Sequence, residues 1–182
     1  MIGYIILGII VILIIFFIAQ YNSLVKLKNQ TEEAWSSIDV QLKRRHDLIP
    51  NLVETVKGYA KHERETLENV IRARNMALNA KDIEERAEAE NFLTGTLKSL
   101  FALSENYPDL KANQNFLQLQ NTLNEIEDNI QNARRYYNAV VRDLNTKIET
   151  FPSNIVANMF NFKKRGYFEI PEAEKEPVQV KF

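Results

Sequence analysis

The chain has 182 residues, of which 45% are apolar, and a formal net charge of −1 at neutral pH. It contains no cysteine, which excludes a disulfide scaffold, a thiolate metal site and a cysteine nucleophile. The balanced charge gives no electrostatic footprint for nucleic acid, so no nucleic-acid partner is expected. The length suits one domain that carries an appendage.

Residues 1–20 are the first predicted element, a transmembrane anchor. They carry no charged side chain, and two glycines and a final glutamine are the only residues that are not apolar. At ~1.5 Å per residue, a helix from Ile2 to Ala19 spans about 27 Å, close to the ~30 Å hydrocarbon core of a bilayer. A cleaved signal peptide needs a basic segment before the apolar run, and a buried helix needs a bundle that covers all its faces. We therefore expect an uncleaved anchor with the lipid bilayer as its partner.

Charges beside the anchor predict its orientation. Lys26 and Lys28 follow the span, and no basic side chain precedes it. The positive-inside rule then places residues 21–182 in the cytoplasm and the N-terminus outside. Tyr4 and Tyr21 bracket the span, as interfacial aromatic residues do. We expect a single-pass protein of the inner (cytoplasmic) cell membrane.

The next element is a long helix that continues from the anchor. Residues 21–182 have only three glycines, which are Gly58, Gly95 and Gly166. So few glycines favour helices over sheets. Apolar residues recur every three or four positions from Leu24 to Tyr59, with Thr31 and Arg45 as exceptions. Because no stop signal precedes this stripe, we expect one continuous helix. Pro50 lies inside the stripe and predicts a kink, since it removes one backbone donor and crowds the carbonyl four residues earlier.

Breaks between later helices are predicted from turn and capping residues. A turn is expected over residues 59–63, and a joint over residues 79–82 ends in a candidate N-cap aspartate. Pro108 is expected to end the third helix region, and Asp109 to cap the last long helix. That helix carries an apolar stripe from Leu110 to Phe151, after which a proline stops it. The predicted fold is all-α: the transmembrane helix continues into an elongated antiparallel bundle of long helices.

The end of the chain forms a third predicted segment after the anchor (1–20) and the bundle (21–151). Residues 152–182 hold a short aromatic-rich helix, a basic run and an acidic tail over 171–182 that is expected to stay unpacked. The apolar residues at this end of the chain could close the bundle, pack on a neighbouring protomer or enter the membrane surface, and closure of the bundle is preferred. These residues are Phe151, Ile155, Met159, Phe160, Phe162 and Phe168.

Five segments carry recognisable motifs: Glu33-Ala34-Trp35-Ser36-Ser37-Ile38-Asp39, Asp47-Leu48-Ile49-Pro50-Asn51-Leu52-Val53, Tyr107-Pro108-Asp109-Leu110, Ala133-Arg134-Arg135-Tyr136-Tyr137-Asn138 and Phe151-Pro152-Ser153-Asn154-Ile155. Together they resemble the signature of the bacterial LemA family over nearly the whole chain. The chain departs from the pattern at Asn161, where the family has Gly between two Phe, and at the less aromatic segment 143–145. The resemblance implies single-pass membrane proteins with a cytoplasmic helical bundle, no established enzymatic activity and, for some relatives, a role in membrane organisation or invagination.

No residue pattern predicts catalysis. His62 and Glu63 begin like a zinc-binding helix, but no second histidine follows one turn later. His46 and Asp47 are adjacent and therefore point to different helix faces. No serine nucleophile motif, phosphate-binding glycine loop or dinucleotide fingerprint occurs. We predict a non-enzymatic protein with no catalytic residue, no cofactor and no metal ligand, and we expect Trp35 in the core.

Two functions agree with these observations. The first is a membrane scaffold that self-associates as a homo-oligomer and organises or shapes the membrane. A candidate self-association surface covers residues 39–59, where Asp39, Lys43 and Asp47 step by four, although a solvated helix face has the same pattern. The second is a regulatory adaptor subunit that binds a membrane-protein partner, such as a protease or a transporter.

Overall fold

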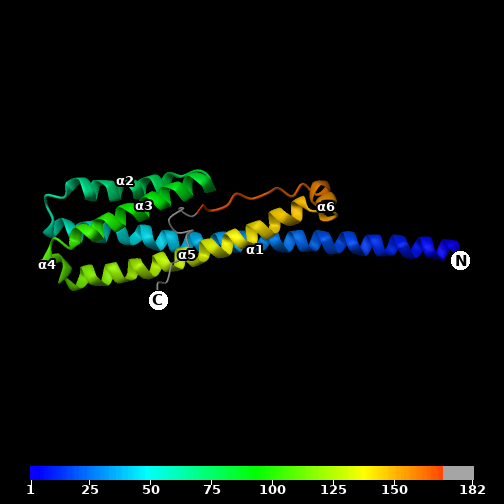
Figure 1. The fold of residues 1–182 in the computed structure, drawn as a ribbon, viewed down its shortest axis with the longest axis horizontal. Helices are drawn as coiled ribbons and strands as arrows, with labels where there is room; N and C mark the ends of the chain where they lie inside the picture. The colour runs from blue at the N-terminus through cyan, green and yellow to red at the C-terminus, as the bar shows by residue number, and fades with distance from the viewer. Residues whose placement is uncertain (170–182) are drawn as a thin grey trace, which may run out of the picture. The chain divides into compact units, whose positions relative to one another are not determined.

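A computed structural model of the protein describes residues 1–169. Within this range the chain forms helices and no strand (Figure 1), which confirms the predicted all-α fold. The helices are α1 (Ile2–Tyr59), α2 (Arg64–Asn79), α3 (Ile83–Ser104), α4 (Pro108–Lys111), α5 (Gln114–Glu149) and α6 (Ser153–Met159). The prediction for residues 171–182 lies outside the described residues.

The chain divides into two compact units, which share the long helices α1 and α5. The first unit combines Met1–Ser36 with Arg135–Gly166, and the second combines Ser37–Arg134 with residues 167–169 of the described chain. α1 runs as a single helix from the apolar N-terminal segment into both units, as its continuous apolar stripe predicted.

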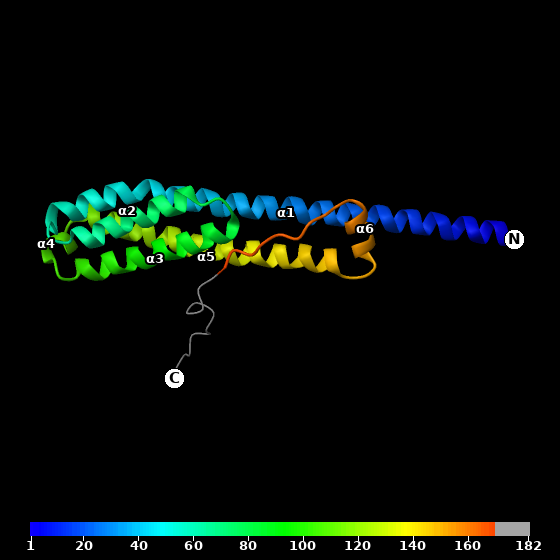
Figure 2. The same ribbon diagram turned by 90° about the horizontal axis from the view of Figure 1, so that it is seen from above.

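The first unit is built where α5 and α6 pack on α1. Both views show α6 beside α1, away from the N-terminal end of α1 (Figures 1 and 2). A small apolar cluster holds the three helices together: Leu24, Leu144, Ile148, Val156 and Ala157, with Phe17, Leu27 and Phe162 packed against them. This cluster fixes α6 beside the part of α1 that directly follows the apolar span.

The second unit contains the larger core. In it α2 and α3 lie side by side in both views (Figures 1 and 2). Apolar residues from all four long segments of the unit meet there, among them Ile49, Val56, Val70, Leu93, Leu100 and Phe116. Each segment contributes residues three or four positions apart, which is the spacing that places side chains on one face of a helix.

The three predicted breaks are present, since α3 also ends at Ser104 before Pro108, but one predicted cap is wrong. α1 ends at Tyr59 and α2 begins at Arg64, while Asp82 caps α3 by accepting a hydrogen bond from the Glu85 amide at 2.7 Å. Asp109 does not cap the last long helix. Pro108 instead opens the single turn α4, and Asn113 caps α5 by accepting a hydrogen bond from the Phe116 amide at 3.0 Å. Both positions carry good capping residues, and the fold uses the later one.

Pro50 lies within α1, which continues through it. Because proline has no amide hydrogen, the carbonyl of His46 loses its helical partner. Arg74 of α2 supplies a replacement, since its Nε donates a hydrogen bond to that carbonyl at 2.9 Å. The proline therefore creates an acceptor that connects two helices, while the kink itself stays a prediction.

Candidate functional site

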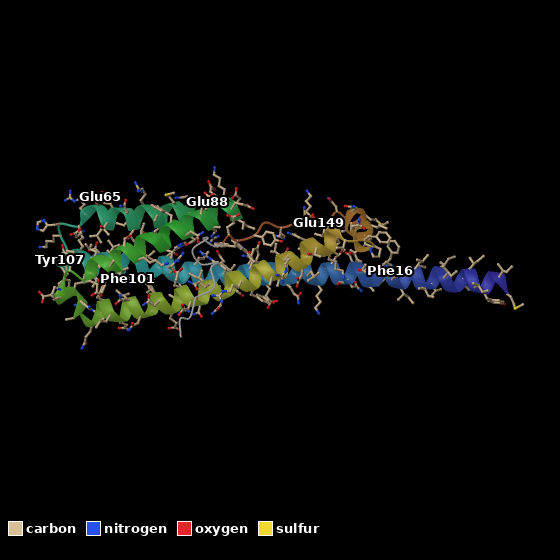
Figure 3. The ribbon with its side chains drawn as sticks, viewed as in Figure 1. Phe16, Glu65, Glu88, Phe101, Tyr107 and Glu149 are labelled. Carbon is tan, nitrogen blue, oxygen red and sulfur yellow. The ribbon has the colours of Figure 1, made fainter. Side chains whose placement is uncertain are left out.

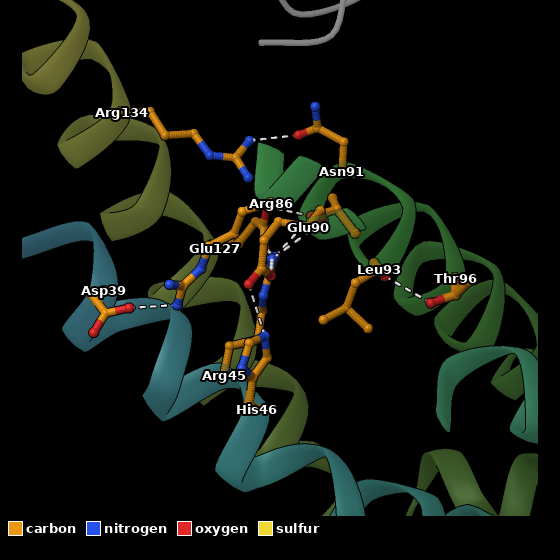
Figure 4. Close-up of polar contacts among 11 residues, drawn as sticks. Asp39, Arg45, His46, Arg86, Glu90, Asn91, Leu93, Thr96, Glu127 and Arg134 are labelled. Carbon is orange, nitrogen blue, oxygen red and sulfur yellow. Dashed lines mark hydrogen bonds and ion pairs between the residues drawn. The ribbon is translucent and has the colours of Figure 1, made fainter. Parts of the chain in front are cut away.

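Charged side chains from three helices meet inside the second unit (Figure 4). Arg45 of α1 donates hydrogen bonds to Glu90 of α3 and to Glu127 of α5, each at 2.5 Å. Thr94 accepts a hydrogen bond from Arg45 at 2.8 Å and donates one to Glu127 at 3.0 Å. The Nε2 atom of His46 lies 2.9 Å from Oε1 of Glu90. We call these five residues the buried charge cluster.

Electrostatics in this cluster favour the ionised form of Glu90. Burial by itself raises the pKa of a carboxyl, but contact with His46 and the positive charge of Arg45 outweigh it, so the pKa of Glu90 lies below its ordinary value. The side chains of Arg45 and Glu90 are both 0% exposed. Their charges therefore join α1 to α3.

The sequence contained one signal for this cluster. Arg45 stands in the apolar stripe of α1, where a charged residue is out of place unless it is buried with a partner. Glu90 holds the corresponding inward position on α3. The stripe marks Arg45 only as an exception, and it does not name the partners of Arg45 because they lie 45 and 82 residues away.

The remaining polar residues singled out from the sequence take structural positions. Asp39 pairs with Arg86 of α3 at 2.5 Å, so the simple ladder of Asp39, Lys43 and Asp47 along one helix is not what the structure shows. His62 is exposed in the turn between α1 and α2. Glu63 accepts a hydrogen bond from the Tyr107 hydroxyl at 2.9 Å, which raises the pKa of Tyr107.

Trp35 was expected in the core and is only half-buried. Its ring packs against that of Tyr137 with the centroids 5.5 Å apart, within the first unit. His46 is buried whereas Asp47 is exposed, as expected for neighbours on different helix faces. Among residues 1–169, no group of histidine and carboxylate side chains is placed to hold a metal ion. The absence of catalytic and cofactor-binding residues stays a prediction.

The N-terminal part of α1 is long and apolar enough to cross a membrane. Its best 18-residue window has a mean hydropathy of 3.2 and is 0% buried. Figure 3 shows the side chains before Phe16 projecting away from the helix with no neighbouring element. A helix that exposes isoleucine and leucine on every face suits a hydrocarbon environment, since in water it would expose a large apolar surface.

Where this apolar part ends, the chain returns to α1 through α6. The rings of Tyr21 and Phe160 lie 4.6 Å apart, and those of Tyr21 and Phe162 lie 6.0 Å apart. Lys147 of α5 donates a hydrogen bond to Ser23 at 2.6 Å. These contacts place the end of α5 and residues 160–162 beside the residues that directly follow the apolar span.

The six apolar residues for which the sequence predicts three alternative packings, from Phe151 to Phe168, do not all adopt one of them. Phe162 packs against the cluster of the first unit, and Phe168 is buried in the second unit with the Arg134 guanidinium 4.5 Å from its ring centroid. The other four apolar side chains are exposed: Phe151, Ile155, Met159 and Phe160. Closure of the bundle therefore explains part of the segment, and the preferred reading was incomplete.

After α6 the chain runs back over α5 and is held by specific polar contacts. The side chain of Asn145 donates to the Arg165 carbonyl and accepts from the Arg165 amide, both at 2.9 Å. Arg165 also pairs with Glu32 at 3.0 Å, and Lys164 with Glu149 at 2.6 Å. Sequence reasoning missed Asn145, because an asparagine that binds a distant backbone has no local signature.

The turn after α6 forms although Asn161 stands where the family pattern has glycine. Its φ is 56°, in the left-handed region that favours glycine. Asparagine is the residue other than glycine that enters this region most readily, because its short polar side chain hydrogen-bonds locally. The turn after α6 therefore tolerates Asn161 in place of the expected glycine.

Comparison with known proteins identifies the family. Residues 34–182 match the LemA family. The chain belongs to this family. A Protein LemA from Metamycoplasma hominis is 30% identical over 169 residues, which cover 90% of this chain and 75% of that protein. Magnetosome protein MamQ 2 from Paramagnetospirillum magneticum is 24% identical over 185 residues, which cover 87% of this chain and 68% of that protein.

Membership in the LemA family confirms the resemblance found in the motifs. The matched region begins after the apolar span and includes the whole of the second unit. Neither LemA nor MamQ is the name of an enzyme. Together with the apolar N-terminal helix, the relatives support a membrane-associated protein, and the finer function requires a proposal.

Proposed function

We propose that this LemA-family protein is a non-enzymatic, single-pass scaffold of the cytoplasmic membrane that self-associates through its cytoplasmic helices and organises the membrane. The observation that carries the proposal is α1. Its exposed apolar segment continues without a break into the helix that packs against α5 and α6 inside one compact unit. Because one helix joins the folded part to the lipid-spanning part, a movement of the folded part is transmitted to the lipid-spanning part. A scaffold that organises the membrane requires such a connection.

Exposed charges support a cytoplasmic location of the folded part. Lys26 and Lys28 are both exposed within the first turns after Tyr21. The N-terminal side of the span has no basic side chain. This asymmetry favours retention of the lysine-bearing side in the cytoplasm. Relatives named as magnetosome proteins agree with a role at a specialised membrane.

A surface for self-association lies on the exposed face of α1 in the second unit. Residues three or four positions apart form this face, which we call the α1 outer face: Val40, Lys43, Arg44, Asp47, Asn51, Glu54 and Lys57. It carries charges of both signs beside the exposed Val40, and opposite charges can pair with a neighbouring copy. This face falls within residues 39–59, where the sequence predicted self-association.

The test is the particle mass of the full-length protein in mild detergent. We expect a homo-oligomer, and we expect Asp47→Lys to shift the particles to lower mass, because the variant reverses a charge at the centre of the α1 outer face. Asp128→Lys is the matched control, since Asp128 is also exposed but lies on α5, outside this face. A protein that is monomeric at all concentrations contradicts the scaffold function.

A second function, that of an adaptor for a membrane protein, is favoured by a cleft between α1 and α2. The cleft has a volume of about 500 Å³ and combines apolar with charged residues: Val53, Glu54, Lys57, Lys61, Arg64, Leu67, Glu68 and Ile71. An adaptor predicts a stoichiometric partner that co-purifies from native membranes and is lost in Ile71→Arg. Leu78→Arg is the control, because Leu78 is exposed on α2 but does not line the cleft.

A further inference from the structure

α6 carries apolar side chains on two faces, and only one of them is used by the fold. Val156 and Ala157 are buried against α1 and α5. On the other side Ile155 and Met159 are 45% and 65% exposed, and Phe151, which precedes the helix, is 79% exposed. Ile155 and Met159 are four residues apart within α6, so they form one row along the helix. Phe160, which directly follows the helix, is 53% exposed.

The position of this row along α1 is fixed by contacts within the first unit. Phe160 stacks on Tyr21, while Phe17 packs against the cluster that contains Val156 and Ala157. At ~1.5 Å per residue, the exposed apolar part of α1 from Ile2 to Ile18 covers about 25 Å, most of the thickness of a hydrocarbon core. The level of Tyr21 is therefore the level at which α1 leaves the hydrocarbon.

The charges around α6 suit a lipid surface. Residues 150–168 contain no aspartate or glutamate, whereas three basic residues follow the aromatic ones. Lys164 and Arg165 are used in ion pairs with Glu149 and Glu32, but Lys163 is exposed, as are Lys26 and Lys28 on α1. Basic side chains beside an apolar row are the pattern by which short helices bind the interface of an anionic membrane.

We infer that the exposed row of α6, formed by Ile155 and Met159, inserts into the lipid leaflet at the point where α1 leaves it, together with the exposed Phe151 and Phe160 at the two ends of the helix. The inference rests on the membrane anchoring by α1 that is part of the proposed function. It adds a second contact with the bilayer, which holds the first unit against the membrane surface. The lipid surface is favoured over a second copy of the chain because contacts of Phe160 with Tyr21 and of Phe17 with the α6 cluster hold α6 at the end of the apolar part of α1.

The absence of native cysteine allows a direct test with single spin labels. Full-length protein is reconstituted into vesicles of phosphatidylethanolamine and phosphatidylglycerol with one label at Met159→Cys and, separately, at Ile155→Cys. Collision with oxygen, which concentrates in lipid, is compared with collision with a water-soluble nickel complex. Ile10→Cys calibrates the hydrocarbon, and Asn29→Cys, exposed on α1 about 12 Å beyond Tyr21, calibrates the aqueous side.

We expect labels at Met159 and Ile155 to favour oxygen over nickel several-fold more than the label at Asn29. Labels that resemble Asn29 overturn the inference and leave the anchor intact. Labels shielded from both reagents also overturn it, since they show packing on protein, as in contact with a second copy. If the label at Ile10 favours nickel, the anchoring by α1 is wrong, and the inference that depends on it is wrong as well.

Discussion

At the scale of single residues, the buried charge cluster is the most constrained feature of the second unit. An ionised group without a partner is very costly in an apolar interior, and Arg45 meets this cost with two carboxylates and a hydroxyl. Because the partners come from α3 and α5, the cluster forms only when these helices are correctly aligned with α1. We interpret it as a device that selects this arrangement.

Replacement of Arg45 tests that interpretation. Arg45→Met keeps much of the side-chain volume but removes the guanidinium that pairs with the buried Glu90, so we expect a loss of about 3–5 kcal/mol in the free energy of unfolding. A further Glu90→Gln substitution in this background is expected to recover part of the loss. The measurement is urea unfolding of the full-length protein in mild detergent. Arg44→Met, an exposed neighbour, is the control and is expected to change stability by less than about 0.5 kcal/mol.

The lowered pKa of Glu90 predicts a dependence of stability on acid. The folded protein keeps Glu90 ionised below the ordinary carboxyl pKa of 4.5, so Glu90 stabilises the fold above that pH. This contribution is lost as the pH falls from 4.5 through the lower pKa of the folded state. The difference in unfolding free energy between the wild type and Glu90→Gln should therefore shrink over this range. A difference that stays constant down to pH 3 would show that Glu90 does not titrate as described.

At the scale of elements, α1 and α2 are joined at the point where Pro50 removes a backbone hydrogen bond from α1. Pro50 deprives the His46 carbonyl of its helical donor, and Arg74 donates to the same oxygen. A buried acceptor without a donor costs about 1–3 kcal/mol, so this single contact offsets much of the disturbance that the proline introduces. The proline and the arginine are thus one structural unit, although 24 positions separate them in the sequence.

A double-mutant cycle tests the coupling of these residues. Arg74→Met should destabilise the protein by about 1–3 kcal/mol, because it leaves the His46 carbonyl without a donor. In a Pro50→Ala background the same change should cost less, since the new amide at position 50 can bond to that carbonyl. Unfolding free energies of the four proteins give the coupling. Arg72→Met, on the exposed face of α2, should show no coupling with Pro50.

At the scale of the whole molecule, orientation in the membrane decides which compartment the folded part occupies. Lys26 and Lys28 are the basic residues within the distance over which the positive-inside rule operates, about 15–20 residues. Lys43 and the arginines after it lie further along the chain. The proposed cytoplasmic location therefore depends on these two lysines.

A reporter at the C-terminus tests this orientation. Alkaline phosphatase, which is active only outside the cytoplasm, should be inactive when fused to the wild-type chain. We expect activity to rise when Lys26→Gln and Lys28→Gln are combined, because the charge difference across the span is then reduced. The control combines Lys57→Gln and Lys61→Gln, which remove the same charge far from the span. An active wild-type fusion would place the folded part outside.

The sequence by itself determined the all-α fold, the apolar span, the family and most helix ends. These features depend on local patterns: an uninterrupted apolar run, a spacing of three or four residues, and capping residues such as Asp82. Helix formation and membrane partitioning respond to neighbours along the chain, so a sequence contains most of the information that they need.

Only the tertiary structure decided what meets across the chain. It gave Arg45 its two carboxylates, chose Asn113 over Asp109 as the cap of α5, and divided the apolar residues of α6 between the fold and the exposed row. In each case the deciding energy is burial or a hydrogen bond with a residue distant in sequence. Such partners are set by how helices pack, and periodicity along one helix does not specify which other helix it will meet.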